Sequence, residues 1–443
     1  MNVLSYFTDA VLRGPTIGCM LMCLAAGLVG VIVFLRKQSL LGESLSHAAY
    51  PGVVLGAIIA AALQETSDLY LSAFILVGAF FAALAGLWAI HYLQLLKIRT
   101  DSALCFVLSC FFGLGITLAS HLQFSHPAAY RQIQGYLYGQ AATMTDIHIL
   151  IFGALSLLIL CCLLLFYKEL QIITFNRDYA RGLGLPVHKM DVLVYILIVL
   201  SVVIGIRSVG VVLMSAMLIA PAAAARQYTN QLSTLLFLAA FFGLVSAFLG
   251  NYLSVELTHQ FAIQYPRAHI TLPTGPTIVL VASFICLISI FFSPERGLAL
   301  RLWRIARFRH QCMRENLLKA IWREGVDEEI TFEQIGQIQK ISKFYLHFIL
   351  VGLVNNGWLE KTGPYTYRLT ADGAQWAAKI VRLHRLWEVY LADYLGIGAE
   401  RVHHNAEEME HILTPELENE LTLLLNDPQL DPHQQRIPGK ATL

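Results

Sequence analysis

The first 300 residues consist almost entirely of apolar stretches about as long as a lipid bilayer is thick. Nine such stretches follow one another, at residues 15–35, 45–64, 70–95, 103–120, 147–167, 191–207, 210–225, 233–253 and 274–293. A helix needs roughly 20 apolar residues to cross the hydrocarbon core of a membrane. Because Pro51 and Pro221 interrupt two of the stretches, we expect eight or nine membrane-spanning helices in an all-α polytopic fold.

Charge divides the chain into two parts with different surroundings. Residues 1–299 hold 14 Lys and Arg and 11 Asp and Glu, whereas residues 300–443 hold 17 and 19. Charged residues make up only 14% of the chain, against about 25% in a soluble globular domain. This composition excludes an ordinary cytosolic enzyme. Because no GxxxxGK[ST] loop is present, we also expect the chain to bind no nucleotide and to have no enzymatic activity.

The basic residues predict how the chain crosses the membrane. They cluster at Arg36/Lys37, Lys97/Arg99, Lys168–Lys189, Arg226 and Arg296–Arg309, whereas the alternate loops, 121–146 and 254–273, hold only Arg131 and Arg267. Loops rich in Lys and Arg stay on the cytoplasmic side. We therefore expect the C-terminal third to be cytoplasmic. Arg301–Arg309 would either contact membrane lipid as a basic amphipathic helix or simply anchor the last span.

A carboxylate and an imidazole stand at the start of the second apolar stretch. Glu43 and His47 are four residues apart, so a helix places them on one face. A charge at membrane depth costs on the order of 3 kcal/mol unless it faces a cavity or a partner. Carboxylate oxygen and imidazole nitrogen together suit Mn, Fe or Zn. The pair is therefore either part of a metal path or an ion pair at the end of a helix.

The sequence around this pair resembles the permease subunits of bacterial ABC importers for zinc, manganese and iron. The resemblance covers, in the family's order, Leu28–Gly56, Asp178–Pro186, Val209–Arg226, Leu272–Leu280 and Phe292–Gly297. It implies a fold like that of type II ABC importers in the bacterial inner membrane, with Glu43 and His47 in the translocation path. It also implies three partners: a cytosolic ABC ATPase, an extracytoplasmic metal-binding protein and a second permease subunit.

Two cytoplasmic loops are candidates for contact with the ATPase, Phe175–Pro186 and Ala222–Gln231. The similarity of the family to vitamin B12 and siderophore permeases favours the second, where Pro221 precedes a run of small residues. We therefore expect Ala222, Ala225 and Arg226 to belong to the coupling loop.

The region after residue 313 has the pattern of a winged helix-turn-helix. Helical periodicity at Glu315–Arg323, Thr331–Gln339 and Ser342–Asn355 is followed by two short predicted strands, Trp358–Lys361 and Tyr365–Leu369. The helix that would read DNA has only Lys343 and His347 as long polar donors near its start. Because base readout needs such side chains, the pattern favours packing against protein. Operator DNA remains the alternative, with Lys343 and His347 as its contacts.

Six nitrogen and oxygen donors with helical spacing lie near the C-terminus. His384 and Glu388 are at i and i+4, and the next predicted helix carries His403, Glu407, Glu410 and His411. Such donors suit Mn²⁺ or Fe²⁺, although a solvated helix face can carry the same pattern.

The region from Asn316 to Gly439 resembles the iron- and manganese-dependent repressors of the diphtheria-toxin-repressor family. The matching segments include 359–373, 384–396 and 402–421. The resemblance implies that His384, Glu388 and His403 form one metal site, and that Glu407, Glu410 and His411 form part of another. Glutamate at position 407 is typical of the manganese type, so manganese or iron is favoured, with zinc as a further candidate.

Together these features predict four segments: a metal ABC permease (1–297), a basic connector (298–313), a winged helix-turn-helix (314–370) and a metal-binding and dimerisation domain (371–443). The chain would import a divalent transition metal and carry a metal-responsive, repressor-like domain. Two alternatives remain. One is a membrane-embedded transcription regulator without transport, and the other is a gradient-driven secondary transporter.

Overall fold

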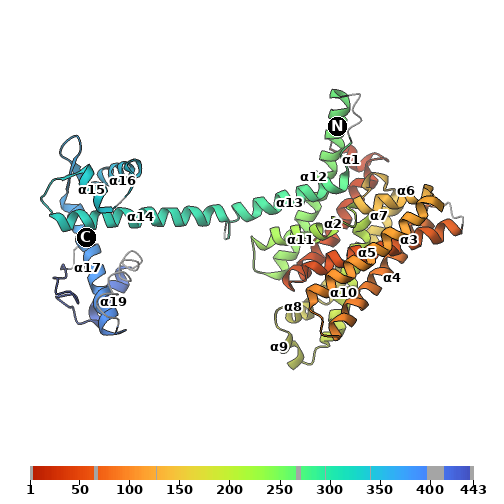
Figure 1. Ribbon diagram of the computed structural model, residues 1–443, viewed down its shortest axis with the longest axis horizontal. Coiled ribbons are helices and arrows are strands. Elements are labelled where there is room, and N and C mark those ends of the chain that lie inside the picture. Colours follow the sequence, from red (N-terminus) through yellow and green to blue (C-terminus); the bar gives the residue numbers. More distant parts are fainter. Residues whose placement is uncertain are drawn as a thin grey trace. The chain divides into compact units, whose positions relative to one another are not determined.

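The computed structural model describes residues 3–63, 68–125, 127–265, 271–294, 296–339, 341–396 and 414–439. The chain divides into two compact units, Met1–Leu300 and Arg301–Leu443 (Figure 1). Buried apolar residues form separate core clusters in the two units. The finer boundaries inside the second unit stay a prediction.

The described part of the first unit is helical throughout. Eight helices are long and apolar enough to cross a membrane: α2 (Arg13–Leu35), α3 (Ser39–Ala62), α4 (Asp68–Leu95), α5 (Thr100–Ser125), α7 (Asp146–Leu165), α10 (Val187–Ser208), α12 (Leu232–Gln264) and α13 (Thr274–Phe292). Shorter helices complete it: α1 (Ser5–Thr8), α6 (Pro127–Tyr138), η1 (Ala141–Thr143), α8 (Tyr167–Phe175), α9 (Arg177–Gly182) and α11 (Met214–Arg226). The predicted polytopic all-α fold is confirmed.

The predicted span at 210–225 differs from the other eight. Only 13 residues, Met214–Arg226, form α11, and a turn at Val209–Leu213 separates this helix from α10. Gly210 has a φ of +96°, a conformation that favours glycine. The N–H of Val211 donates to the carbonyl oxygen of Tyr136, on α6, at 3.0 Å. This hydrogen bond to α6 holds the turn, so α11 begins only at Met214.

Polar contacts gather several helix ends at one end of the first unit. Arg36, after α2, donates to Asp191, on α10, at 2.7 Å. Arg226, the last residue of α11, and Arg296, after α13, both donate to the side-chain oxygen of Asn230. Phe34 and Leu35 of α2 pack with buried alanines of α11, so these two groups of arginines lie at the same end. These arginines therefore gather at one end of the unit, and the side of the membrane on which this end lies stays a prediction.

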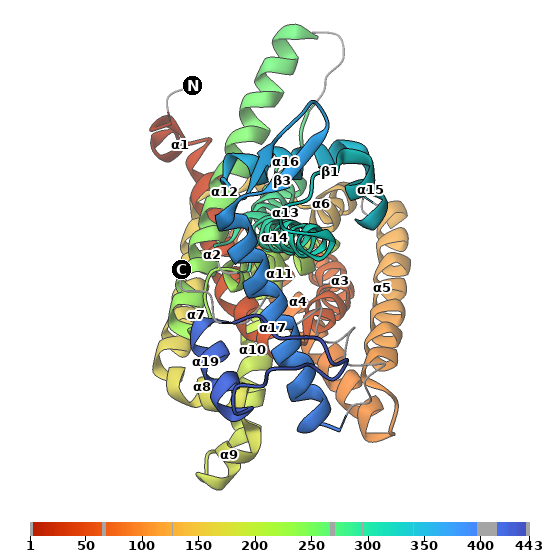
Figure 2. The ribbon, with the colours of Figure 1, turned by 90° about the vertical axis from the view of Figure 1, so that its left-hand side faces the viewer.

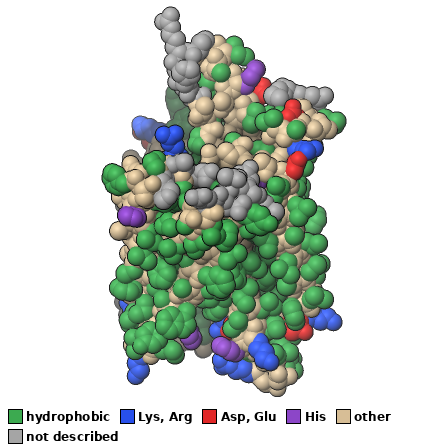
Figure 3. Space-filling view, turned by 90° about the vertical axis from the view of Figure 1, so that its right-hand side faces the viewer, with side chains coloured by type: hydrophobic (Ala, Val, Ile, Leu, Met, Phe, Trp, Pro, Cys, Tyr) green, Lys and Arg blue, Asp and Glu red, His purple; other side chains and the backbone are tan. Residues whose placement is uncertain are grey.

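The opposite end of the unit carries other ion pairs. Arg13, at the start of α2, pairs with Asp146, at the start of α7. The carbonyl oxygen of Arg207, at the end of α10, accepts from the N–H of Gln140 at 2.9 Å. Figure 3 shows a broad belt of hydrophobic side chains between ends that carry the charged ones. α10 ends at the end of the unit that carries Arg207, whereas α11 ends at the end that carries Arg226. The turn and the short α11 therefore connect the two ends of the unit.

Glycines allow the helices of the first unit to pack closely. α2 packs against α7, α10, α11 and α12, and α3 packs against α4 and α5. A Cβ at Gly30 of α2 would collide with the carbonyl oxygen of Leu218 in α11. A Cβ at Gly52 of α3 would likewise collide with the backbone of Gly78 in α4. The α3–α4 and α2–α11 contacts thus depend on glycine at these positions, because glycine has no side chain.

The second unit consists of helices around a small sheet. Its elements are α14 (Leu298–Glu324), β1 (Ile330–Thr331), α15 (Phe332–Gln339), α16 (Lys343–Asn355), β2 (Leu359–Lys361), β3 (Thr366–Leu369), α17 (Ala371–Asp393) and α19 (Pro415–Leu424). The antiparallel sheet has the order β1-β3-β2, with Ile330 opposite Tyr367 and Leu359 opposite Leu369. Figure 2 looks along α14, with α16, β3 and α17 around it. The predicted winged helix-turn-helix is confirmed.

Two features of this unit differ from the prediction. The basic connector predicted at 298–313 is part of α14, which runs without a break from Leu298 to Glu324. The strand β1 was not predicted, because its two residues, Ile330 and Thr331, are too few to show alternation. It pairs with β3 and adds a third strand to the wing.

Candidate metal sites

Glu43 and His47 lie in the first turns of α3, on the same face of that helix, and both are half-buried. The hydroxyls next to them fix the rotation of α3. Ser44 donates to the carbonyl oxygen of Leu104, in α5, at 2.9 Å. Ser46 donates to the carbonyl oxygen of Val211, in the turn before α11, at 3.0 Å. The pair is therefore held by bonds to two other parts of the bundle.

The imidazole of His47 has an incomplete set of polar contacts. Its ring meets the ring of Phe112, in α5, edge to face with 4.7 Å between centroids. Its Nδ1 atom is buried and has no hydrogen-bond partner among the described residues. Pro51 has no N–H to donate to the carbonyl oxygen of His47, four residues earlier. One ring nitrogen and one backbone oxygen of this residue are thus left for another ligand.

Glu43 and His47 have no third His, Cys, Asp or Glu side chain beside them in the part of the chain that the structure describes. Within the described ranges, no three side chains of His, Cys, Asp and Glu are grouped closely enough to hold a metal ion. The pair offers one carboxylate and one imidazole. It can therefore supply ligands to a passing ion but cannot complete the coordination of that ion. Such a weak site suits passage better than storage.

The residues predicted for the coupling loop are mostly buried. Ala222 and Ala225 are fully buried and pack in one cluster with Val31 and Leu235. Arg226 is half-buried and donates to the carbonyl oxygen of Thr229 at 2.8 Å. The two alanines therefore contribute packing to the bundle, and their role in coupling stays a prediction.

The other candidate loop presents apolar side chains to its surroundings. Phe175, Tyr179 and Leu183, on α8, on α9 and just after α9, are 60%, 59% and 53% exposed. Asn176 caps α9 by accepting from the N–H of Tyr179 at 3.0 Å. This capped short helix presents a compact apolar surface at the end of the unit that carries Arg36.

In the second unit, His384 and Glu388 form a buried pair on α17. Nε2 of His384 lies 3.1 Å from Oε1 of Glu388, and each side chain is 2% exposed. One imidazole nitrogen and one carboxylate oxygen side by side are the donors that divalent transition metals take. The chemistry of these two residues therefore fits the metal site that the resemblance implies. The other predicted ligands, His403, Glu407, Glu410 and His411, lie outside the described residues.

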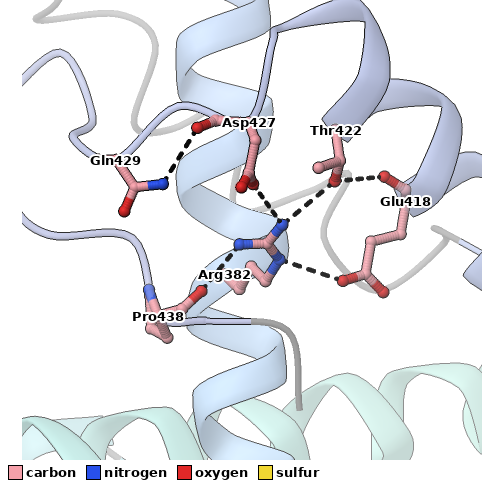
Figure 4. Close-up of polar contacts among 6 residues, drawn as sticks. All are labelled: Arg382, Glu418, Thr422, Asp427, Gln429 and Pro438. Carbon is pink, nitrogen blue, oxygen red and sulfur yellow. Dashed lines mark hydrogen bonds and ion pairs between the residues drawn. The ribbon is translucent and has the colours of Figure 1, made fainter. Parts of the chain in front are cut away.

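Arg382 ties the C-terminal segment 414–439 to α17 (Figure 4). Its guanidinium donates to the carbonyl oxygen of Pro438 at 2.9 Å and to the hydroxyl of Thr422 at 3.3 Å. It also pairs with Glu418 at 3.4 Å and with Asp427 at 3.2 Å. One buried arginine thus holds three separate parts of the segment.

Arg385 forms a second clamp one residue after His384. It donates to the carbonyl oxygen of Arg436 and to the side-chain oxygen of Gln435, and it pairs with Asp431 at 3.4 Å. Burial lowers the pKa of Arg385, although Asp431 acts in the opposite direction. Neither arginine could be predicted from the sequence, because nothing in the spacing of Arg382 and Arg385 marks partners so far along the chain.

The residues predicted to contact DNA are exposed on α16. Lys343 and His347 stand one helical turn apart near the start of the helix, which Ser342 caps. Phe344 and Phe348 stand beside them and are 89% and 61% exposed. The surface of α16 is therefore largely apolar, with two polar side chains at its N-terminal end.

The two units together define a class of protein. Eight apolar helices long enough to cross a membrane define a multi-pass membrane protein, and the second unit adds a winged helix-turn-helix. The ABC 3 transport family matches residues 8–293, and the chain belongs to this family. Residues 370–439 match a second family, described as the iron dependent repressor, metal binding and dimerisation domain.

Three curated relatives place this architecture among metal transport proteins. A "Probable metal transport system membrane protein" of Chlamydia trachomatis is 37% identical over 450 residues, which cover 98% of each chain. The manganese transport system membrane protein MntC of Bacillus subtilis is 33% identical over 84% of this chain and 82% of its own length. The zinc transport system membrane protein TroC of Treponema pallidum is 40% identical over 68% of this chain and 95% of its own length. The first two matches extend into the second unit.

Proposed function

We propose that this chain is the permease subunit of an ATP-driven importer of a divalent transition metal, with a metal-responsive regulatory unit on the same polypeptide. The observation that carries the proposal is the Glu43–His47 pair, set on a core helix of a protein of the ABC 3 transport family. The transported ion would pass this pair as substrate. The chain itself would bind no nucleotide.

The path would be completed by a second permease subunit. One carboxylate and one imidazole are too few to replace the water shell of a divalent ion. A second copy or a paralogue facing the same path would bring a second pair. The carbonyl oxygen of His47, which lacks its usual helical donor, would add an oxygen ligand. An extracytoplasmic metal-binding protein would deliver the ion at the end of the unit that carries Arg13 and Asp146.

Manganese is the first candidate for the ion, followed by iron and zinc. The relative named for manganese matches 84% of this chain, whereas the relative named for zinc matches 68%. The carboxylate–imidazole donor set binds all three metals, so the choice among them rests on similarity alone.

The cytosolic ATPase would dock on the α8–α9 segment. Phe175, Tyr179 and Leu183 expose apolar surface there, whereas the predicted coupling residues Ala222 and Ala225 are buried. Exposed apolar side chains around one short capped helix are typical of a protein contact. Arg226 and the chain that follows it lie at the same end of the unit and would support the contact from the side.

The second unit would respond to the metal that the first unit imports. His384 and Glu388 would hold one ion together with His403, and Glu407, Glu410 and His411 would form part of a second site. Operator DNA is the second candidate partner, through Lys343 and His347. We propose that this unit lies in the cytoplasm of a bacterium whose inner membrane holds the permease, because loops rich in Lys and Arg stay on the cytoplasmic side.

One experiment separates this proposal from its two alternatives. The chain is reconstituted in vesicles loaded with ATP, together with its ATPase, the second permease subunit and the metal-binding protein. Uptake of Mn²⁺ is measured with a wild-type ATPase and with one that cannot hydrolyse ATP. The proposal predicts uptake only with the active ATPase. Uptake that follows a proton gradient without ATP would indicate a secondary transporter. Binding of metal without any uptake would indicate a membrane-embedded regulator.

A further inference from the structure

A pocket of about 230 Å³ lies between one face of α14 and two tryptophans of the second unit. It is lined by Arg307, His310, Gln311, Arg314, Glu315, Trp358 and Trp376. The α14 residues recur every three or four positions, so they share a face of the helix. The rings of Trp358 and Trp376 stack at 5.3 Å with an angle of 13° between their planes.

Several donors in this pocket lack an acceptor. Nε and Nη2 of Arg314 and Nε1 of Trp376 are buried and have no hydrogen-bond partner among the described residues. The Arg314 guanidinium lies over the ring of Trp358 at 5.0 Å. A buried donor without a partner is destabilising, because it has lost its hydrogen bonds to water. The pocket therefore calls for a ligand that brings oxygen acceptors.

The charges in the pocket favour an anionic ligand. Arg307, His310 and Arg314 contribute positive or protonatable groups, and Glu315 contributes one carboxylate, which accepts from Gln311 at 2.9 Å. Burial lowers the pKa of Arg314 and of His310, and Arg314 lowers that of His310 further. Guanidinium and indole N–H groups together suit the oxygens of a phosphate.

An exposed apolar surface adjoins the pocket. Phe344, Phe348 and Val351 of α16 are 89%, 61% and 44% exposed and recur at i, i+4 and i+7. His310 connects this surface to the pocket, because its ring packs against Phe348 at 5.5 Å and its Nδ1 lies 3.1 Å from the hydroxyl of Tyr345. A phosphate site beside an apolar helix face matches the two parts of a phospholipid.

We propose that the second unit binds an anionic phospholipid at this place. Arg314 and Trp376 donate to the phosphate oxygens, and the apolar face of α16 lies against the acyl chains. Only a short stretch of chain separates the pocket from the last span, because this span ends at Phe292 and Arg307 follows only 15 residues later. The helix that a DNA-binding protein would insert into the major groove then serves as a lipid-binding surface.

The test uses the full chain in lipid nanodiscs that contain a photoreactive phosphatidylglycerol or, in a parallel sample, a photoreactive phosphatidylcholine. After illumination, labelled peptides from α14 and α16 are quantified by mass spectrometry. We expect phosphatidylglycerol to label these peptides well above phosphatidylcholine. Arg314→Gln should reduce the labelling about tenfold, as the loss of a charge-assisted hydrogen bond would. Arg368→Gln, a change of an exposed arginine on β3 in the same unit but outside the pocket, should leave it unchanged.

A second variant keeps the test decisive if Arg314→Gln disturbs folding. Trp376→Phe removes the indole N–H but keeps an aromatic ring against Trp358, and it should reduce labelling while thermal unfolding stays that of the parent. Equal labelling of the Arg314→Gln and Arg368→Gln variants would overturn the proposal. So would loss of the labelling on addition of inorganic phosphate or of duplex DNA, because the pocket would then prefer free phosphate or a nucleic-acid backbone.

Discussion

Replacing Arg382 by methionine should release the segment 414–439 from α17. The side chains of Arg382 and Glu418 are 5% and 7% exposed, and their ion pair is buried in the second unit. Methionine is an unbranched side chain of about the same length without a charge. It leaves the carboxylate of Glu418 buried with no cation beside it, and it leaves the carbonyl oxygen of Pro438 without the donor at 2.9 Å.

The size of the effect follows from these contacts. Removing one member of a buried ion pair costs about 3–5 kcal/mol. The lost hydrogen bond to Pro438 adds about 1 kcal/mol. Asp427 is 62% exposed, so its pairing with Arg382 contributes little. We expect the free energy of opening of the segment to fall by about 4–6 kcal/mol.

Hydrogen exchange of the full chain in detergent, read in peptides from 414–439, measures this opening. Arg368→Met removes an exposed pair with Glu360 in the same unit and should change the free energy by less than about 1 kcal/mol. The double variant Arg382→Met/Glu418→Gln should recover much of the loss, because no buried charge remains. An Arg382→Met effect as small as that of Arg368→Met, or a double variant no better than the single one, would refute the reasoning.

Three further outcomes are expected. Gly30→Val should lower the thermal unfolding temperature of the membrane unit because its side chain would meet a backbone carbonyl oxygen of α11, whereas Gly113→Ala, which faces open space, should not. Tyr179→Ser should reduce co-purification of the ATPase while insertion in the membrane is normal. Burial and Arg314 lower the pKa of His310 in the folded chain. The imidazole of His310 therefore takes up a proton more readily in the unfolded chain than in the folded one. The stability of the second unit, followed by thermal unfolding, should therefore fall as the pH drops through about 6.5, and His310→Asn should remove that part of the dependence.

The membrane fold could be predicted from the sequence where length and composition decide it. Apolar stretches such as 15–35 became full-length helices because a bilayer demands about 20 apolar residues in a row. The stretch 210–225 satisfies the same composition and yet contains a turn. Its cause is not local, because the N–H of Val211 bonds to Tyr136 on α6.

The candidate sites, too, could be predicted from the sequence only in part. Glu43 with His47, and His384 with Glu388, could be found because a spacing of four residues puts two side chains on one helix face. The partners that hold them could not be found. Arg382 bonds residues that stand 40 to 56 positions later in the chain, and Ser46 bonds Val211, 165 positions later. Such contacts depend on how the chain packs, which no local pattern encodes.

The most direct test of the metal path is uptake of Mn²⁺ by vesicles that contain the complete importer with Glu43→Gln or His47→Asn. His91→Asn, an exposed histidine on α4, is the matched control. The account predicts that both α3 variants insert normally and bind the ATPase, but lose uptake by more than about tenfold, because each removes a ligand worth at least about 1.4 kcal/mol. The control should transport at the parent rate. Uptake at the parent rate by both α3 variants would contradict the account.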